Sequence, residues 1–269
     1  KNSWAVVTGG SEGIGLAIAK HLAKEGFNLV LIARNLQKLE AAKKALLAIN
    51  QLLDVKIISA DFSESHKAQF FEDLKPKLEG LDISILVNNV GYFPLKHQRD
   101  YSIKEARDTI VVNCCSQVGM SKLLLPGMIK RAKRCAQIDL SSTASVSPVP
   151  VFATYSGTKS VNEFISKGLS TYVPNVDVLC VKPGVVSTPM TANPEAGSGE
   201  PGLKVVTAEQ CVDGIFRSLS FEDETFGATN HYIFGSLYKS IYGLIPRDLV
   251  SKITARNKNL TTLAGWKTK

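Results

Sequence analysis

Short apolar runs and longer amphipathic segments alternate along most of this chain. The runs are rich in β-branched residues, and the central ones are apolar at successive positions, so we expect both faces of those strands to be buried. They predict strands over residues 4–8, 28–32, 55–59, 83–88, 136–140, 176–181 and 231–234. Short strands of this kind are typical of a parallel sheet covered on both sides.

The segments between these runs have the helical spacing of apolar residues. They predict helices over residues 14–25, 36–50, 63–78, 103–131 and 154–172. Strands that alternate with helices form a doubly wound parallel sheet, because each right-handed crossover lays its helix against one face of the sheet. We therefore expect a single α/β domain with a Rossmann-like sheet of about seven strands and helices on both faces.

One irregular stretch interrupts the alternation. Residues 189–202 contain six Gly or Pro among fourteen positions. A segment of that length is typical of a lid or a binding loop, so we assign residues 189–206 to substrate binding; a surface insertion without function is the alternative. No linker precedes residue 235, so we expect one catalytic domain over residues 1–235 and a basic amphipathic extension over 236–269.

The overall composition is that of a soluble globular protein. Hydrophobic residues make up 44% of the 269 positions and charged residues 21%, and no apolar run approaches the ~20 residues of a transmembrane helix. No signal peptide is visible, and the chain starts on a predicted strand without methionine, as expected if an N-terminal segment has been removed. The five cysteines lack CxxC spacing and mostly fall in apolar runs, which indicates reduced core residues and a reducing compartment.

The net charge of +8 is concentrated at the C-terminal end. From Ser236 onward, seven basic residues accompany one acid, so this segment contributes +6. A solvated tail is one interpretation; contact with an anionic membrane surface is the other, because apolar positions accompany the charges. Those positions are Leu244, Ile245, Leu249, Val250 and Ile253. Nucleic-acid binding is disfavoured, because the basic residues are not interleaved with aromatic ones.

A glycine-rich segment lies between the first predicted strand and the first predicted helix. Glycines there let backbone N–H groups and a helix N-terminus approach a pyrophosphate, although glycines also mark ordinary tight turns. The position between strand and helix favours a dinucleotide site. We assign to it Gly9, Ser11, Glu12, Gly13, Ile14 and Gly15.

The end of the second strand indicates which dinucleotide binds. An acidic residue there would bind the ribose 2′-hydroxyl of NAD, but the chain has Ala33 and Arg34. Arg34 can pair with a 2′-phosphate, and Lys38 can assist from the next helical turn. Glu12 opposes this interpretation, because it would repel a phosphate. We expect NADP(H), with NAD(H) as the alternative.

Tyr155 and Lys159 are spaced i, i+4, which places them on one face of the last predicted helix. A free tyrosine has a pKa of about 10, and a nearby ammonium favours the phenolate and lowers that pKa. The pair is therefore suited to acid–base chemistry. The same spacing also occurs on solvent-exposed helices, so its meaning depends on the nucleotide loop earlier in the chain.

These motifs occur with others in a characteristic order. The others are Asp61 after the third strand, NNVG (88–91), Asn113, LSS (140–142) and PGVVST (183–188). With this set the chain resembles the short-chain dehydrogenase/reductase family along essentially its full length. The resemblance implies a catalytic set of Asn113, Ser142, Tyr155 and Lys159. It favours Ser142 over Ser141, because the family's serine precedes the tyrosine by thirteen residues.

The resemblance also implies where the cofactor lies. Asp61 and Phe62 would flank the adenine, Asn89 and Gly91 would lie near the adenosine ribose, and Lys159 would bind the nicotinamide ribose. Val186 and Thr188 would lie at the nicotinamide amide, and the remaining implied cofactor contacts are Tyr155, Pro183 and Gly184. Asn113 would hold a water that links Lys159 to solvent.

Within the family the chain is most similar to one subgroup. NNVG, LLLPGM (123–128) and SPVPVFATYSGTK (147–159) resemble the very-long-chain 3-oxoacyl-CoA reductases and related 17β-hydroxysteroid dehydrogenases. This implies a lipid-like substrate, a homodimer formed through residues 103–131 and 154–172, and the cytosolic face of the endoplasmic reticulum membrane. The ending GWKTK lacks the paired lysines of a retrieval signal, so without the subgroup's anchor the protein would be cytoplasmic.

We therefore expect an NADPH-dependent ketone reductase in which Tyr155 donates the proton. Apolar walls of its substrate site are assigned to Tyr92, Phe93, Val149 and Phe152. A catalytically silent dinucleotide sensor or scaffold and a reductase of small non-lipid carbonyls are the alternatives. The four histidines show no metal-ligand spacing, so no metal is expected.

Overall fold

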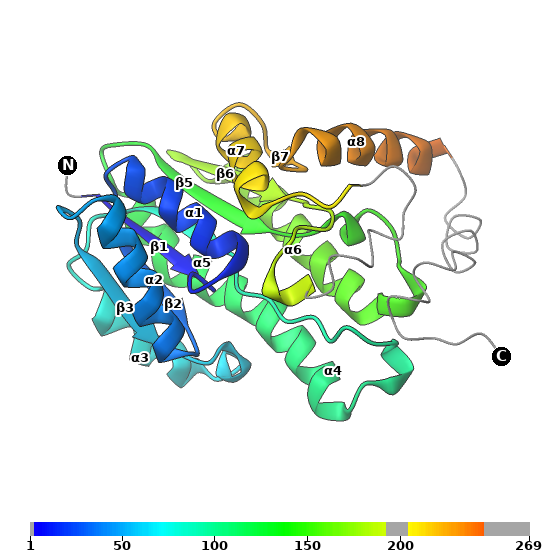
Figure 1. Cartoon of the computed structure of the whole chain (residues 1–269), viewed down its shortest axis with the longest axis horizontal. Coiled ribbons are helices and arrows are strands. Elements are labelled where there is room, and N and C mark those ends of the chain that lie inside the picture. The colour runs from blue at the N-terminus through cyan, green and yellow to red at the C-terminus, as the bar shows by residue number, and fades with distance from the viewer. Residues whose placement is uncertain (1–2, 192–203, 245–269) are drawn as a thin grey trace.

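The computed structural model describes residues 3–191 and 204–244 (Figure 1). Its centre is one parallel sheet with strand order β3-β2-β1-β4-β5-β6-β7. The strands are β1 Trp4–Thr8, β2 Asn28–Ala33, β3 Val55–Ser59, β4 Ile83–Asn88, β5 Cys135–Leu140, β6 Val176–Val181 and β7 Glu224–Thr225. The expected Rossmann-like α/β fold is confirmed.

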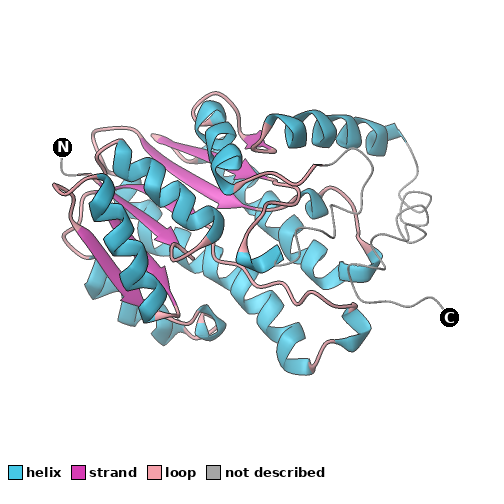
Figure 2. Cartoon of the chain, in the orientation of Figure 1, coloured by secondary structure: helices cyan, strands magenta, loops and turns pink. Residues whose placement is uncertain are grey.

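Helices cover both faces of the sheet (Figure 2). They are α1 Gly13–Lys24, α2 Leu36–Ile49, α3 Ala68–Leu78, α4 Ile103–Ile110, α5 Ser116–Ile129, α6 Ala153–Tyr172, α7 Ala208–Ser218 and α8 Thr229–Leu244. A five-residue π-helical segment, Val111–Cys115, joins α4 to α5. The expected helix over 103–131 is therefore continuous in direction but contains one wider turn.

Alternate residues of the strands belong to two apolar cores. Val7 of β1 packs with α1, α2 and α7, whereas its neighbour Val6 packs with α3 and α5 on the opposite face. Both valines are fully buried. Because successive side chains of a strand point to opposite faces, this two-sided burial explains why the central strands are continuous apolar runs.

The predicted strand over 231–234 is wrong, because these residues lie inside α8. The seventh strand is the two-residue β7, where Glu224 pairs with Cys180 and Thr225 with Val181. A four-residue apolar run does not distinguish a strand from part of a helix by its period. The helix predicted over 63–78 is also divided, into a 3₁₀ turn at Phe62–Glu64 and α3.

The C-terminal predictions fall largely outside the described residues. Helix α8 runs across the expected boundary at residue 235, and the tail from 245 lies beyond the description, as do residues 192–203 of the predicted substrate loop. Within the described ranges, none of the helices is both long and apolar enough to cross a bilayer. All five cysteines are free thiols, and Cys135, Cys180 and Cys211 are buried, as core residues should be.

Candidate active site

A cavity of about 1060 Å³ lies at the carboxyl ends of the strands, where open α/β sheets bind their ligands. It collects side chains and backbone from both halves of the sheet. The candidate residues that line it are Gly9, Ser11, Glu12, Gly13, Ile14, Arg34, Lys38, Asp61, Phe62, Asn89, Gly91, Ser142, Tyr155, Lys159, Pro183, Gly184, Val186 and Thr188. Gly15 and Asn113 lie just behind this lining.

The glycine-rich turn is shaped by close backbone approaches. Gly9 has a φ of +63°, and a Cβ on Gly15 would overlap with the Gly9 carbonyl oxygen and with Asn89 Nδ2. Helix α1 begins at Gly13 without a side-chain cap on its first amides. Its N-terminus therefore presents unpartnered N–H groups beside the cavity, which is the arrangement that binds phosphates.

Asn89 supports this turn from the neighbouring strand end. Its Nδ2 donates to the carbonyl oxygens of Thr8, at 2.9 Å, and Gly9, at 3.1 Å. The Thr8 hydroxyl accepts from the backbone N–H groups of Asn89 and Val90. The donors of the Asn89 side chain therefore hold the turn between β1 and α1, and only its Oδ1 is left for a ligand.

The charges at the end of β2 face the glycine-rich turn. Lys38 Nζ lies 2.7 Å from Glu12 Oε2, and both side chains are about half exposed. This pairing neutralises the carboxylate that would otherwise repel a phosphate. Arg34 is exposed at the cavity edge beside the pair. The structure thus brings together Glu12, Arg34 and Lys38, the three residues whose charges the sequence analysis weighed in relation to a 2′-phosphate.

Tyr155 and Ser142 meet in the cavity. The Ser142 Oγ accepts the backbone N–H of Ala144 at 3.1 Å, and the side chains of Ser142 and Tyr155 both line the cavity. Burial raises the pKa of Tyr155 to about 12, and the nearby Ser142 hydroxyl opposes that rise only in part. The phenol is therefore protonated at neutral pH.

Burial outweighs any influence of Lys159 on the pKa of Tyr155, contrary to what the i, i+4 spacing suggested. Its Nζ lies 5.8 Å from the centre of the Tyr155 ring and donates to the Leu140 carbonyl oxygen at 2.7 Å. Burial lowers the pKa of Lys159 to about 8. Desolvation therefore dominates both groups, because each loses water on burial and each favours its neutral form.

Ser141 and Ser142 point to different partners. Ser141 Oγ donates to the Lys159 carbonyl oxygen at 2.7 Å and so ties β5 to α6. Ser142, by contrast, lines the cavity together with Tyr155. The geometry therefore separates a serine that holds the helix from one that faces the candidate proton donor.

Asn113 lies in the π-helical segment and is fully buried. Its Oδ1 accepts the Tyr92 N–H at 2.7 Å, and its Nδ2 donates to the Tyr92 carbonyl oxygen at 3.0 Å and to Thr158 Oγ1 at 3.0 Å. A Cβ built on Gly91 would lie 3.4 Å from Asn113 Oδ1 and 3.7 Å from Lys159 Nζ. Asn113 thus holds the segment after β4 close to Lys159.

Three of the four residues assigned to the substrate walls gather beside the Tyr155 ring, whereas Tyr92 lines the cavity but packs against the core on the α3 and α5 side of the sheet. The Phe93 ring lies 4.3 Å from the Tyr155 ring and 4.9 Å from the Phe152 ring, centre to centre. Val149 and Phe152 form a small apolar cluster with Phe93 packed against it. This end of the cavity is apolar, and the Tyr155 hydroxyl is its polar group.

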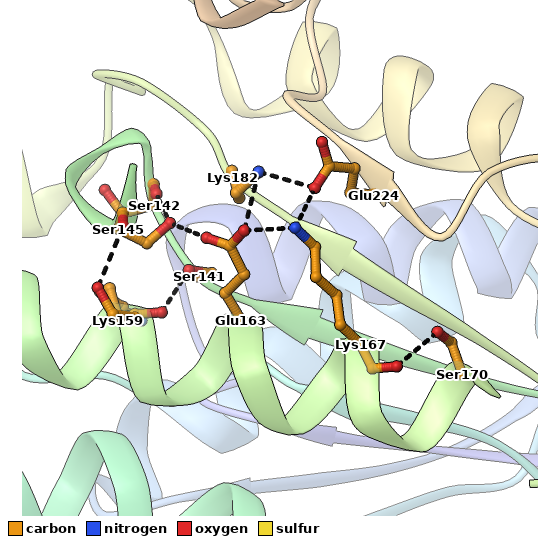
Figure 3. Close-up of polar contacts among 10 residues, drawn as sticks. Ser141, Ser142, Ser145, Lys159, Glu163, Lys167, Ser170, Lys182 and Glu224 are labelled. Atoms are coloured by element: carbon orange, nitrogen blue, oxygen red, sulfur yellow. Dashed lines mark hydrogen bonds and ion pairs between the residues drawn. The ribbon is translucent and has the colours of Figure 1, made fainter. Parts of the chain in front are cut away.

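An ion-pair network behind Ser142 was not anticipated from the sequence (Figure 3). Lys182, at the end of β6, is fully buried and lies 3.2 Å from Glu163 and 2.9 Å from Glu224. Lys167 bridges the same two carboxylates. Ser145 Oγ donates to Glu163 Oε2 at 2.6 Å. The only sequence signals are a lysine at the end of an apolar strand and Glu163 one turn after Lys159.

The candidate residues carry no grouping suited to a metal. In the described ranges, no cluster of three or more His, Cys, Asp or Glu is arranged to hold an ion. Asp139 is fully buried and accepts from Asn88 Nδ2 at 2.8 Å and Gln137 Nε2 at 2.9 Å. Burial raises the pKa of Asp139, and its partners show that it joins β4 to β5 behind the cavity.

The chain is similar to known proteins over most of its length. The family model described as short chain dehydrogenase matches residues 3–198. The chain is 36% identical over 245 residues to 17-beta-hydroxysteroid dehydrogenase type 3 of Danio rerio. The matched region covers 88% of this chain and 76% of that protein. It is 33% identical over 261 residues to very-long-chain 3-oxoacyl-CoA reductase of Mus musculus, with 93% and 78% covered.

A solved structure has the same fold. It is a short-chain dehydrogenase from Sphingobium yanoikuyae in complex with NADPH, with a TM-score of 0.74 and 22% sequence identity. The superposition covers 90% of this chain and 94% of that one.

Proposed function

This chain belongs to the short chain dehydrogenase family, and on that premise we propose that it is an NADPH-dependent reductase of a ketone on a lipid-like substrate. Like the relatives at 33–36% identity, it is an oxidoreductase acting on hydroxyl or keto groups with a nicotinamide dinucleotide. The observation that carries the proposal is the position of Tyr155. Its protonated hydroxyl shares with Ser142 one cavity that also holds the glycine-rich turn and an apolar wall.

The described residues fit a dinucleotide. The uncapped N-terminus of α1 and the close approach of Gly9 and Gly15 leave room and donors for a pyrophosphate. Arg34 lines the cavity directly after β2, where its guanidinium is available to pair with a 2′-phosphate, and Lys38 offsets the charge of Glu12. These features favour NADPH over NADH, and the similar Sphingobium yanoikuyae protein was solved with NADPH.

Four residues at the cavity have separate roles in the proposed ketone reduction. A bound NADPH supplies a hydride to the carbonyl carbon. Tyr155 donates its proton to the developing alkoxide oxygen, and the Ser142 hydroxyl donates a hydrogen bond to the same oxygen, where a fixed donor stabilises emerging charge. Lys159 binds the nicotinamide ribose and resupplies the proton. Asn113 keeps the segment at Tyr92 in place and holds the water that connects Lys159 to solvent.

The substrate is proposed from the apolar end of the cavity. Phe93, Val149 and Phe152 present hydrocarbon beside the Tyr155 ring, which suits a ketone within an apolar chain or ring system. Two similar proteins are named for a 17-beta-hydroxysteroid and for a very-long-chain 3-oxoacyl-CoA. We therefore place the substrate among acyl thioesters and steroids rather than small polar carbonyls.

The direct test is turnover by the purified protein. NADPH is mixed in turn with a long-chain 3-oxoacyl-CoA, a 17-ketosteroid and a small ketone, and loss of the reduced nicotinamide is followed by absorbance. Faster turnover of either lipid supports the proposal and identifies its class. NADPH binding without turnover of any ketone supports the sensor alternative, and turnover of the small ketone alone supports the small-carbonyl alternative.

We further propose a homodimer and a membrane-surface location. Large apolar side chains are exposed on α4, α5 and α6, among them Ile103 at 89% and Phe164 at 79% exposure, as expected of a surface that a second copy covers. The exposed Tyr232, Ile233 and Leu237 of α8 precede the basic tail. They support contact of this end with an anionic bilayer at the cytosolic face of the endoplasmic reticulum.

A further inference from the structure

The first turn of α8 contacts two backbone segments that border the candidate active site. His231, in that turn, is fully buried although Tyr232 and Ile233 beside it are exposed. Its Nδ1 accepts the Gly184 N–H at 3.1 Å, and its Nε2 lies 2.9 Å from the Lys204 carbonyl oxygen. An amide N–H only donates and a carbonyl only accepts, so the proton of the neutral ring is on Nε2.

Asn230 completes the contact with Lys204. Its Oδ1 accepts the Lys204 backbone N–H at 3.0 Å. Adjacent side chains of α8 therefore bind both polar groups of one residue. An isolated contact would leave one of those groups free, whereas this pair fixes the position and the orientation of the Lys204 backbone.

The two segments that His231 contacts, at Gly184 and at Lys204, lie before and near the end of the predicted substrate loop. Gly184 lines the cavity three residues after the end of β6. Lys204 lies near the end of the predicted substrate loop, two residues before Val206. Val206 pairs with Val186 in an isolated parallel bridge, through Ser187 N–H to the Val206 carbonyl at 2.8 Å and Val206 N–H to the Val185 carbonyl at 3.2 Å. His231 thus provides a second, separate link between the two segments.

Other contacts hold α8 against the sheet. A Cβ on Gly235 would overlap with the Phe226 ring, so the helix backbone lies directly on that ring. Tyr232 adds an edge contact to the same ring, 6.3 Å from its centre. The helix is therefore also held by contacts other than those of His231, whose hydrogen bonds go to Gly184 in the cavity lining and to Lys204, two residues before Val206.

We propose that His231 is a positioning residue that fixes Gly184 at the nicotinamide end of the cavity and, with Asn230, fixes the Lys204 end of the substrate loop. The inference rests on the proposed function for the meaning of those two places. The two bonds are expected to act on different ligands: Gly184 on NADPH and Lys204 on the ketone.

Two near-isosteric variants separate the bonds. In His231→Asn the Oδ1 replaces Nδ1, keeps the acceptor for Gly184 and loses the reach to Lys204. In His231→Gln the amide nitrogen replaces Nε2, keeps the donor to Lys204 and loses the acceptor for Gly184. The Asn variant should raise the KM for the ketone several-fold and leave the NADPH Kd within about twofold, because one hydrogen bond changes an equilibrium by roughly two- to tenfold. The Gln variant should raise the NADPH Kd and lower kcat.

Control variants distinguish positioning from general destabilisation. Asn230→Ala should raise the KM for the ketone as His231→Asn does, and Ser240→Ala, at an exposed position of the same helix, should leave all three constants unchanged. Each variant's Tm is measured alongside. The role of His231 is overturned if the Asn and Gln variants share one profile, or if both match the wild type.

A cofactor-free measurement separates this inference from the proposed function. Hydrogen–deuterium exchange followed by mass spectrometry should show faster exchange at Gly184 and over 204–206 in His231→Leu, with α1 unchanged. If the wild type neither binds NADPH nor turns over a ketone, the proposed function fails, while the exchange result still decides whether His231 holds these segments. Unchanged exchange at both segments would overturn the contact itself.

Discussion

Burial, more than pairing, sets the protonation of the two central side chains. Tyr155 and Lys159 share a helix face, yet each is desolvated and each is shifted toward its neutral form. A general acid must be protonated before it can donate a proton to the alkoxide oxygen that forms when a ketone is reduced. Lys159, with a pKa of about 8, is the group whose charge changes near neutral pH.

This predicts how NADPH binding depends on pH. Because the pKa of Lys159 is lowered to about 8, the ammonium is present below that pH and is lost above it. NADPH affinity should therefore be constant from pH 6.5 to 7.5 and weaken progressively between pH 8 and 10. The titration is followed by NADPH fluorescence in Tyr155→Phe, which removes the tyrosine as a second titrating group. Affinity that stays constant to pH 10 would contradict a role for the Lys159 ammonium.

Glu12 and Lys38 predict the effect of a single carboxylate on cofactor choice. Glu12→Gln removes a negative charge beside the expected 2′-phosphate and releases the Lys38 ammonium. NADPH affinity should rise several-fold and NADH affinity little. Because both side chains are about half exposed, the pair contributes at most ~1 kcal/mol to folding and Tm should hardly change. Arg34→Ala removes a positive charge at the same place and should lower the affinity for NADPH relative to NADH. If the ratio of the NADPH and NADH Kd values is unchanged in both variants, Glu12, Arg34 and Lys38 do not select the cofactor.

At the level of elements, six of the seven strands were predictable because buried parallel strands are continuous apolar runs. The error at 231–234 arose where a helix shows four apolar or aromatic residues in a row. Helix α7 was not predicted, although the capping box that Thr207 and Gln210 form marks its start. The network at Lys182 was not predictable, because its partners come from α6 and β7 and meet only in the folded chain.

That network predicts a large cost for removing one carboxylate. Glu163→Ala leaves Lys182 fully buried with only Glu224 beside it, and Lys167 also loses a partner. Breaking a buried ion pair on one side costs about 3–5 kcal/mol, and the remaining carboxylate places the expected loss near the lower end. Urea unfolding measures it. Lys67→Ala, in an exposed pair with Glu64, is the control and should change the free energy of unfolding by less than ~1 kcal/mol; equal effects of the two variants would refute the ranking.

At the level of the whole molecule, the exposed apolar face of α4, α5 and α6 predicts association. Phe164→Glu should convert a dimer to a monomer, because a charge would be desolvated at the contact. Leu52→Glu, at a residue 94% exposed on the turn between α2 and β3, should leave the dimer intact. Light scattering after size exclusion measures both masses. A monomeric wild type would contradict the dimer. An unchanged dimer in Phe164→Glu would show that the dimer contact does not involve this face.

The central claim is that one cavity holds a dinucleotide and a proton donor for the same reaction. Tyr155→Phe removes only the hydroxyl, and positioned general acids contribute roughly 10²- to 10⁴-fold to turnover. The decisive measurement is NADPH-dependent ketone reduction by this variant beside its NADPH Kd. We predict that Tyr155→Phe loses at least about 10²-fold in kcat, while its NADPH Kd stays within about twofold of the wild type. Turnover within tenfold of the wild type, at full NADPH binding, would contradict it.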